Sequence, residues 1–135
     1  MTGTRATVTA MGATNASPPK LTERELQDNI VALCRWLGLL CYHTHDSRHS
    51  AAGFPDLVIV GKHVIFVELK SASGDLSKAQ GCWRDALQES DNGNFRVWRP
   101  ADWWSGSIRA QLEAVMHRAE FRAGIAPRPE RRGAQ

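Results

Sequence analysis

The sequence predicts a single α/β domain with a mixed central β-sheet flanked by helices. Its 135 residues fit one domain, since domains typically run about 100–200 residues. Hydrophobic residues make up 42% and charged residues 23% of the chain, which is ordinary for a packed globular protein. Helical and strand-like patterns alternate along the chain in the order α-β-β-β-α-β, with one further helix at the end.

The first helix is expected to begin after Thr22, a residue type that caps helix N-termini. Glu23 and Glu25 would lie in its first turn, where acidic side chains suit the helix dipole. Apolar residues then recur at helical spacing until Gly38, which suits the position just beyond a helix end. Residues 39–45 are expected to form a strand and residues 46–53 a polar loop.

Two apolar runs, at residues 57–60 and 64–70, predict a pair of neighbouring strands. A connection that includes Gly61, Lys62 and His63 would pair Val60 with Val64. Asp56 would then fall opposite Glu68. A strict two-residue turn would instead make Asp56 face away, so we predict the longer connection or a bulge.

The second half of the chain predicts helix, strand and helix. Ser77 is expected to cap a helix that runs to about Glu89, and residues 91–94 to form a turn. A last strand would span residues 95–98 and end before Pro100, and a last helix would span residues 108–122.

These elements define the expected domain organisation. Residues 1–20 lack periodicity and are predicted to be a disordered leader, residues 21–123 the folded domain, and residues 124–135 a flexible basic tail. Met11 is an alternative start.

Composition excludes several classes of protein. No apolar run approaches the roughly 20 residues that a membrane-spanning helix needs, and the first twenty residues lack the apolar stretch of a secretory signal. Cys34, Cys41 and Cys82 are odd in number and show no CxxC spacing, which favours a reducing compartment over a disulfide framework. The net charge of +3 suits a polyanionic partner without requiring one.

Asp56, Glu68 and Lys70 form the set of residues with the clearest chemistry. Glu68 and Lys70 are two apart on a strand and therefore share a face. On an apolar strand both are costly to bury unless they are paired or bind a metal. Two carboxylates at one end of a sheet suit Mg²⁺ or Mn²⁺, and a nearby lysine can orient water for hydrolysis of a phosphodiester. The alternative is a structural Glu–Lys pair on an exposed strand.

The order of short motifs resembles the PD-(D/E)XK nucleases, and within them the stand-alone VRR-NUC domains of phages and bacteria. The resemblance covers roughly residues 22–104 and rests on these phrases: Asp46-Ser47-Arg48, Gly53-Phe54-Pro55-Asp56-Leu57, Glu68-Leu69-Lys70-Ser71, Gly74-Asp75-Leu76-Ser77, Gln80-Gly81-Cys82-Trp83 and Val97-Trp98-Arg99-Pro100.

The resemblance implies a restriction-endonuclease-like core and assigns roles to individual residues. Asp56 and Glu68 would bind the divalent metal, with the Leu69 carbonyl as a further ligand. Lys70 would be the catalytic lysine. Gln80 would line the site, together with an acidic residue of the first helix, for which Glu23 (with Gln27 one turn on) fits best and Glu25 competes.

The implied function is Mg²⁺-dependent endonucleolytic cleavage of DNA, with Mn²⁺ as a substitute and branched DNA such as a Holliday junction as one candidate substrate. We expect a homodimer, because a two-fold dimer presents two equivalent sites. We also expect the protein to act in the cytoplasm of a bacterium or of a phage-infected cell. One rival is a non-catalytic DNA-binding or recombination accessory protein of the same fold. The other is a zinc hydrolase built on His43, His45 and His49.

Contacts to the DNA backbone are expected from Arg48, Lys62 and Ser47. The adjacent Trp103 and Trp104 are candidates for exposure, either to stack on bases or to enter a subunit interface. Trp83 and Trp98 are expected to be core or interface residues.

Overall fold

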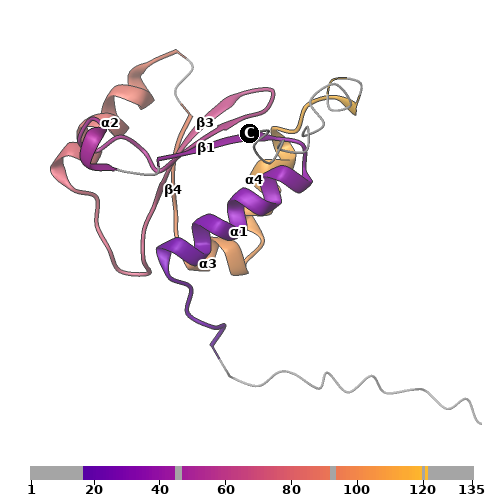
Figure 1. Ribbon diagram of the computed structural model, residues 1–135, viewed down its shortest axis with the longest axis horizontal. Coiled ribbons are helices and arrows are strands. Elements are labelled where there is room, and N and C mark those ends of the chain that lie inside the picture. Colours follow the sequence, from indigo (N-terminus) through magenta and orange to yellow (C-terminus); the bar gives the residue numbers. More distant parts are fainter. Residues whose placement is uncertain (1–16, 45–46, 92–93, 120, 122–135) are drawn as a thin grey trace, which may run out of the picture.

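The computed structural model describes residues 17–44, 47–91, 94–119 and 121. The described part of the chain forms four strands, four α-helices and one short 3₁₀ helix (Figure 1). In chain order they are α1 (Glu23–Trp36), β1 (Leu40–His43), η1 (Ser47–His49), β2 (Leu57–Val60), β3 (Val64–Leu69), α2 (Lys78–Glu89), β4 (Asn94–Trp98), α3 (Pro100–Trp104) and α4 (Ser107–Ala114).

The strands form one mixed sheet, as predicted, and they lie in the order β1-β2-β3-β4. β1, β2 and β3 are antiparallel to one another, whereas β3 and β4 are parallel. Val60 pairs with Val64 and Leu57 with Val67, which confirms the three-residue connection between β2 and β3. One step beyond that last pair, the register sets Asp56 opposite Glu68.

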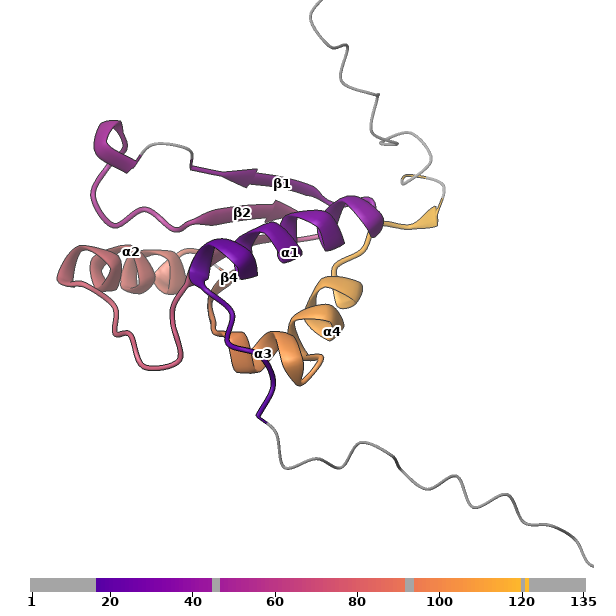
Figure 2. The ribbon, with the colours of Figure 1, turned by 60° about the horizontal axis from the view of Figure 1, so that its bottom comes forward.

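The core lies between one face of the sheet and the helices α1 and α4 (Figure 2). Side chains alternate along each strand, so every second residue of β2 and β3 faces these helices. Burial of each large aliphatic side chain contributes roughly 1.5–3 kcal/mol, so this layer dominates stability. Its main members are Leu26, Ile30 and Cys34 of α1, Leu57 and Ile59 of β2, Ile65, Val67 and Leu69 of β3, and Ile108 and Leu112 of α4.

The opposite face of the sheet is covered in part by α2, which contacts β4. No residue of α2 is fully buried. Instead, Phe54 makes edge-on ring contacts with Phe66 of β3 and Trp83 of α2, at centroid separations of 6.4 and 5.1 Å. Glu68 points to this face, because it alternates with the core residues Val67 and Leu69. The position of α2 therefore depends on a small number of specific contacts.

Both long helices begin with a capping box. The Thr22 hydroxyl accepts a hydrogen bond from the Glu25 amide, and the Glu25 carboxylate accepts one from the Thr22 amide. Ser77 and Gln80 make the same reciprocal pair at the start of α2. Thr22 and Ser77 were predicted as caps, and Gly38 lies just past α1 with a φ of 71°, as its predicted role requires.

The first strand and the last helix are shorter than predicted, and one observed helix was not predicted. The first strand covers residues 40–43 within the predicted range 39–45, and positions 45 and 46 lie outside the described residues. Pro100 ends β4 but also starts α3, a helix that was not predicted, since proline suits the first position of a helix.

The last helix is shorter than the predicted range 108–122. α4 ends at Ala114, and the carbonyl of Val115 accepts a hydrogen bond from the Lys62 amide at 2.8 Å. This contact joins the end of the helix to the turn between β2 and β3. Apolar spacing alone could not place that end, because Met116 continues the pattern.

The tryptophans differ in exposure. Trp98 is buried in the core, as predicted, and Trp83 is half-buried against Phe54. Trp103 packs against the core, whereas Trp104 is 44% exposed and its ring N–H donates to the Pro19 carbonyl. Pro19, within the predicted leader, therefore contacts α3.

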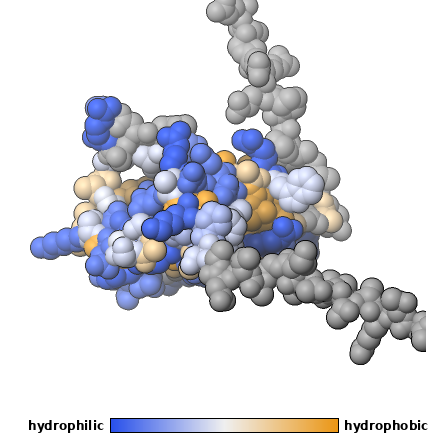
Figure 3. Space-filling model, turned by 90° about the horizontal axis from the view of Figure 1, so that it is seen from below, coloured by the Kyte–Doolittle hydropathy of each residue, from blue (hydrophilic) through white to orange (hydrophobic). Residues whose placement is uncertain are grey.

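The polarity of the surface is consistent with an apolar core beneath it. The face seen from below is largely hydrophilic, with a limited apolar area (Figure 3). Within the described residues, none of the helices is long and apolar enough to span a membrane.

Candidate active site

Asp56 lies at the start of β2, at the end of the sheet away from the β2–β3 turn. Its Oδ2 accepts a hydrogen bond from the Leu69 amide at 2.8 Å. This bond joins the start of β2 to the last residue of β3 and holds the carboxylate beside Glu68. Pro55, which precedes it, is buried, so the entry of the chain into β2 is fixed by packing.

Glu68 is the buried carboxylate of the site, with 3% of its side chain exposed. Gln80 Nε2 donates to Glu68 Oε1 at 2.7 Å, and Lys70 Nζ lies 3.7 Å from the same oxygen. Burial raises the pKa of Glu68 to about 8, with a further contribution from the Asp56 carboxylate, while Lys70 opposes the shift. The carboxylates of Asp56 and Glu68 therefore repel each other, and a cation bound beside them would reduce this repulsion.

Glu23, in the first turn of α1, is the acidic residue that the helix brings to the site. Its Oε1 accepts a hydrogen bond from the Ser71 amide at 3.1 Å. Glu25, the competing residue, instead uses its carboxylate to cap its own helix at Thr22.

These residues line one hollow of about 330 Å³. Its walls come from α1, the end of β3, α2 and the segment before β2, and they include Glu23, Asp56, Glu68, Lys70 and Gln80. A second hollow of about 340 Å³ shares Glu23 and Asp56 with the first and also exposes Arg24, Gln27 and Leu69. Residues that are up to 57 positions apart in sequence, from 23 to 80, thus meet at one end of the sheet.

The donor set has the chemistry of a hard-cation site. Asp56 and Glu68 supply carboxylate oxygens, and a backbone carbonyl at Leu69 would supply a third. Among the residues that the structure describes, no group of three or more His, Cys, Asp and Glu side chains could hold a metal. A metal here would therefore need a carbonyl or water in addition to the two carboxylates.

The same finding bears on the zinc alternative. His43 lies on β1 and His49 on η1, and neither joins a group of three such side chains in the described part of the chain. His45 lies outside the described residues.

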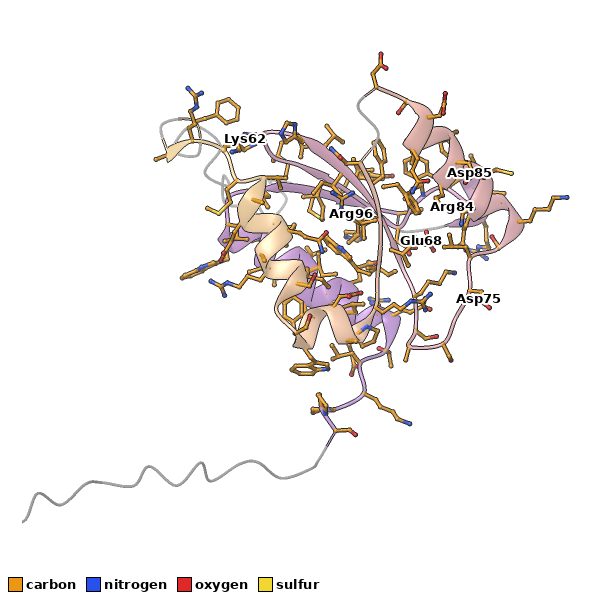
Figure 4. All side chains as sticks on the ribbon, turned by 180° about the vertical axis from the view of Figure 1, so that it is seen from behind. Lys62, Glu68, Asp75, Arg84, Asp85 and Arg96 are labelled. Carbon is orange, nitrogen blue, oxygen red and sulfur yellow. The ribbon has the colours of Figure 1, made fainter. Side chains whose placement is uncertain are left out.

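Of the residues expected to contact DNA, Lys62 does not lie at the hollow. Lys62 lies in the turn at the opposite end of the β2–β3 pair from Asp56 and Glu68 (Figure 4). Lys62 lies six positions after Asp56, roughly 20 Å at about 3.3 Å per strand residue. Lys62 therefore lies at the turn of the strand pair, whereas the site occupies the open end of that pair.

Arg48 and Ser47 lie on η1, in the connection that leads to the hollow. The Arg48 side chain is exposed, and the Ser47 side chain lies outside the described residues. Ser50, which follows η1, lines the hollow.

Gly53 is a structural determinant of the site. It belongs to a motif that carries the family resemblance, but the sequence analysis gave it no structural role of its own. Its φ is +81°, and a Cβ placed on it would lie 2.4 Å from the Ala79 carbonyl carbon and 2.6 Å from the Gln80 amide. The loop before β2 therefore packs directly against the first turn of α2. A glycine just before Phe-Pro-Asp was the available signal, since glycine marks positive φ or close backbone approach.

Comparison with known proteins agrees with this geometry. The family model of the VRR-NUC domain matches residues 13–101, a range that contains Glu23, Asp56, Glu68, Lys70 and Gln80. No curated protein matches the chain.

Among solved structures, a protein described as a VRR_NUC domain protein aligns with a TM-score of 0.53 and 18% sequence identity. The alignment covers 74% of this chain and 95% of that protein, and it confirms the predicted restriction-endonuclease-like fold. With the family model matching well over half of its length, the chain belongs to the VRR-NUC domain family, which is nuclease-type.

Proposed function

We propose that this protein is a Mg²⁺-dependent endonuclease that hydrolyses phosphodiester bonds in DNA. The observation that supports this proposal best is the convergence of Asp56, Glu68, Lys70, Gln80 and Glu23 on one hollow from separate parts of the fold. Two carboxylates that can hold a divalent metal, with a lysine beside them to orient water, form a set that can carry out metal-assisted phosphodiester hydrolysis.

The residues present fit a divalent cation. Asp56 and Glu68, with the Leu69 carbonyl, would hold Mg²⁺ or its substitute Mn²⁺, because hard oxygen donors suit both ions. The raised pKa of Glu68 reflects its burial first and the neighbouring Asp56 carboxylate second, and Lys70 opposes the shift only in part. When bound, the metal would activate water and stabilise charge on the phosphoryl oxygens.

The chain's own side chains would orient the other participants. Lys70 is 14% exposed, so its ammonium group is held in place and can orient the attacking water and offset phosphate charge. Gln80 would hold Glu68 in one rotamer through the 2.7 Å hydrogen bond. Glu23, which lines both hollows, would add a third carboxylate beside Asp56 and Glu68.

Branched DNA, with a four-way junction as the test case, and a homodimer extend this proposal. A two-fold dimer would present two sites and engage two DNA arms at once, which raises effective concentration without new contacts. β1 is an edge strand on which Leu40 and Tyr42 are exposed, so a second copy could cover apolar surface there.

A cleavage panel tests the function directly. Wild-type protein, Asp56→Asn and Glu68→Gln would be incubated with single-stranded, duplex, flap and four-way-junction DNA in Mg²⁺, Mn²⁺, Zn²⁺ or EDTA. Asp85→Asn, on the exposed side of α2, is the control for loss of one carboxylate. We expect both site variants to lose at least about 100-fold in cleavage rate while the control keeps the wild-type rate.

Each alternative outcome has a defined meaning. Binding of DNA without cleavage under any metal would favour the non-catalytic accessory protein. Cleavage restored by Zn²⁺ but not by Mg²⁺ would favour the zinc hydrolase. If linear duplex competes as well as a four-way junction for binding in Ca²⁺, the preference for branched DNA fails and the nuclease assignment remains.

A further inference from the structure

The strands β3 and β4 separate immediately beside the candidate active site. Their parallel pairing ends at Leu69 and Trp98, and the Lys70 amide still donates to the Trp98 carbonyl at 3.0 Å. Beyond this point β3 continues into the loop 71–75, and β4 continues through Arg99 into α3. Lys70 is therefore the last residue of the site whose backbone is hydrogen-bonded to a neighbouring strand.

The side chain of Arg99 bridges the two diverging segments. Its Nη1 donates to the Ser71 carbonyl and to the Gly74 carbonyl, both at 2.7 Å. These are short, charge-assisted bonds to main-chain atoms on another element. Other arginines behave differently, since the guanidinium groups of Arg24, Arg84 and Arg109 each pair with a carboxylate at most four residues away.

The backbone of Arg99 is also fixed. Its amide donates to Asp102 Oδ2 at 2.8 Å, and the residue is half-buried. The guanidinium therefore acts as a rigid link from the start of α3 to the loop 71–75.

That loop in turn holds Glu23. The Gly74 amide donates to the Ser71 hydroxyl at 3.0 Å, which closes the loop, and the Ser71 amide donates to Glu23 Oε1 at 3.1 Å. Glu23 is otherwise an exposed side chain in the first turn of α1, with the rotamer freedom of a surface glutamate. The Ser71 amide is the contact that directs it along the border between the two hollows.

We propose that Arg99 is a positioning residue, which fixes the loop Ser71–Gly74 so that the Ser71 amide holds the Glu23 carboxylate at the site. The proposal rests on the proposed function insofar as Glu23 serves the same metal and substrate as Asp56 and Glu68. No hydrogen bond or ion pair joins Arg99 to the carboxylates of Glu23, Asp56 or Glu68. Its effect on Glu23 passes through the loop.

Three variants isolate this role. Arg99→Met keeps the aliphatic stem but removes both hydrogen bonds. Arg99→Lys can restore them, because a single nitrogen, Nη1, makes both bonds and an ammonium group also carries several donors. Arg109→Met, on α4, removes a cation that pairs with Glu113 and serves as the matched control for loss of charge.

The first measurement is hydrogen exchange in metal-free protein, followed by NMR. We expect the Ser71 and Gly74 amides to exchange at least about tenfold faster in Arg99→Met than in wild type, because local opening exposes them. Arg99→Lys and Arg109→Met should stay within about threefold of wild type at both amides.

The second measurement is calorimetric titration with Mn²⁺ alone, followed by cleavage kinetics. Loss of an outer partner of a metal ligand typically costs about 10–100-fold in affinity or activity. Glu23 borders the metal site without being one of its proposed ligands, so we expect Arg99→Met to lower Mn²⁺ affinity in the same direction as Glu23→Gln and by no more than that variant does. DNA affinity in Ca²⁺ should change by less than about threefold, so that the loss appears in kcat and not in KM.

A double-mutant cycle distinguishes positioning from a general loss of stability. In a Glu23→Gln background, Arg99→Met should cause little further loss of Mn²⁺ affinity, because the group that Arg99 positions is already changed. Full additivity of the two losses would overturn the proposal, as would an Arg99→Met protein with wild-type exchange at Ser71 and wild-type Mn²⁺ affinity.

If Arg99→Met does not fold, Ser71→Ala replaces it, since it opens the loop at an exposed position without touching Arg99. It should lower Mn²⁺ affinity in the same direction, and an unchanged affinity would contradict the proposal. Absence of cleavage by wild-type protein would instead count against the proposed function, while exchange and Mn²⁺ affinity still decide the role of Arg99.

Discussion

Gln80 Nε2 donates a 2.7 Å hydrogen bond to the buried Glu68 carboxylate, while Gln80 Oε1 accepts one from the Ser77 amide at 2.8 Å. One side chain thus completes the N-terminal cap of α2 and holds a carboxylate of the site. The two functions explain why the spacing Ser77-x-x-Gln80 matters here, and they can be separated by substitution.

Gln80→Glu should preserve the helix and impair the site. Glutamate also completes a capping box, so α2 should remain folded, but a third carboxylate would face Glu68 without a donor between them. We expect unchanged far-ultraviolet circular dichroism and a cleavage rate about 10–100-fold lower at pH 7, partly recovered at higher Mg²⁺. A wild-type kcat at low Mg²⁺ would show that the amide donor is unimportant.

Lys70→Met should abolish cleavage but retain metal binding. Lys70 Nζ lies 3.7 Å from Glu68 and carries no lone pair when protonated, so it orients other groups and is no ligand. We expect at least about a 100-fold lower rate. Titration with Mn²⁺ checks the assignment, and a loss of affinity as large as that of Glu68→Gln would contradict it.

The stability of the metal-free protein should depend on pH through Glu68. The pKa of Glu68 rises from 4.5 to about 8 on folding, so the folded state binds its proton more tightly than the unfolded state. The resulting stabilisation is fully present below about pH 4.5 and is lost as the pH rises through about 8.

Urea denaturation in EDTA at pH 5, 7 and 9 measures this effect. We expect the free energy of unfolding to fall across the series more steeply in wild type than in Glu68→Gln, which carries no titrating group at this position. Parallel curves for the two proteins would show that burial does not shift Glu68 as described. Mg²⁺ should flatten the wild-type curve, because binding favours the ionised carboxylate.

Gly53→Ala should impair the site through α2. The substitution adds a Cβ at a φ of +81° and within 2.4 Å of the backbone of Ala79. Gly106→Ala is a close control, since its φ is +82° and no atom lies within 4 Å of the added Cβ. Both should lose about 1 kcal/mol or more from the backbone conformation, measured by urea denaturation.

Only Gly53→Ala should also reduce cleavage strongly, because the clash displaces the first turn of α2 and with it Gln80. Equal cleavage rates for the two alanine variants would show that the close contact at Gly53 does not position Gln80.

The sequence by itself determined the elements whose signals are local. The caps Thr22 and Ser77 were correctly predicted because a capping residue acts within one turn of its helix. The β2–β3 register followed from the predicted three-residue connection, which sets Asp56 opposite Glu68. The family followed from a resemblance carried by the ordered set of short motifs, and the family model confirms it.

Only the tertiary structure decided the features that depend on packing between distant segments. It distinguished Glu23 from Glu25, because the Ser71 amide reaches one of them while the other caps its own helix. It also revealed the contact of Gly53 with α2, which no local pattern encodes, since the two backbones meet only after the sheet has formed.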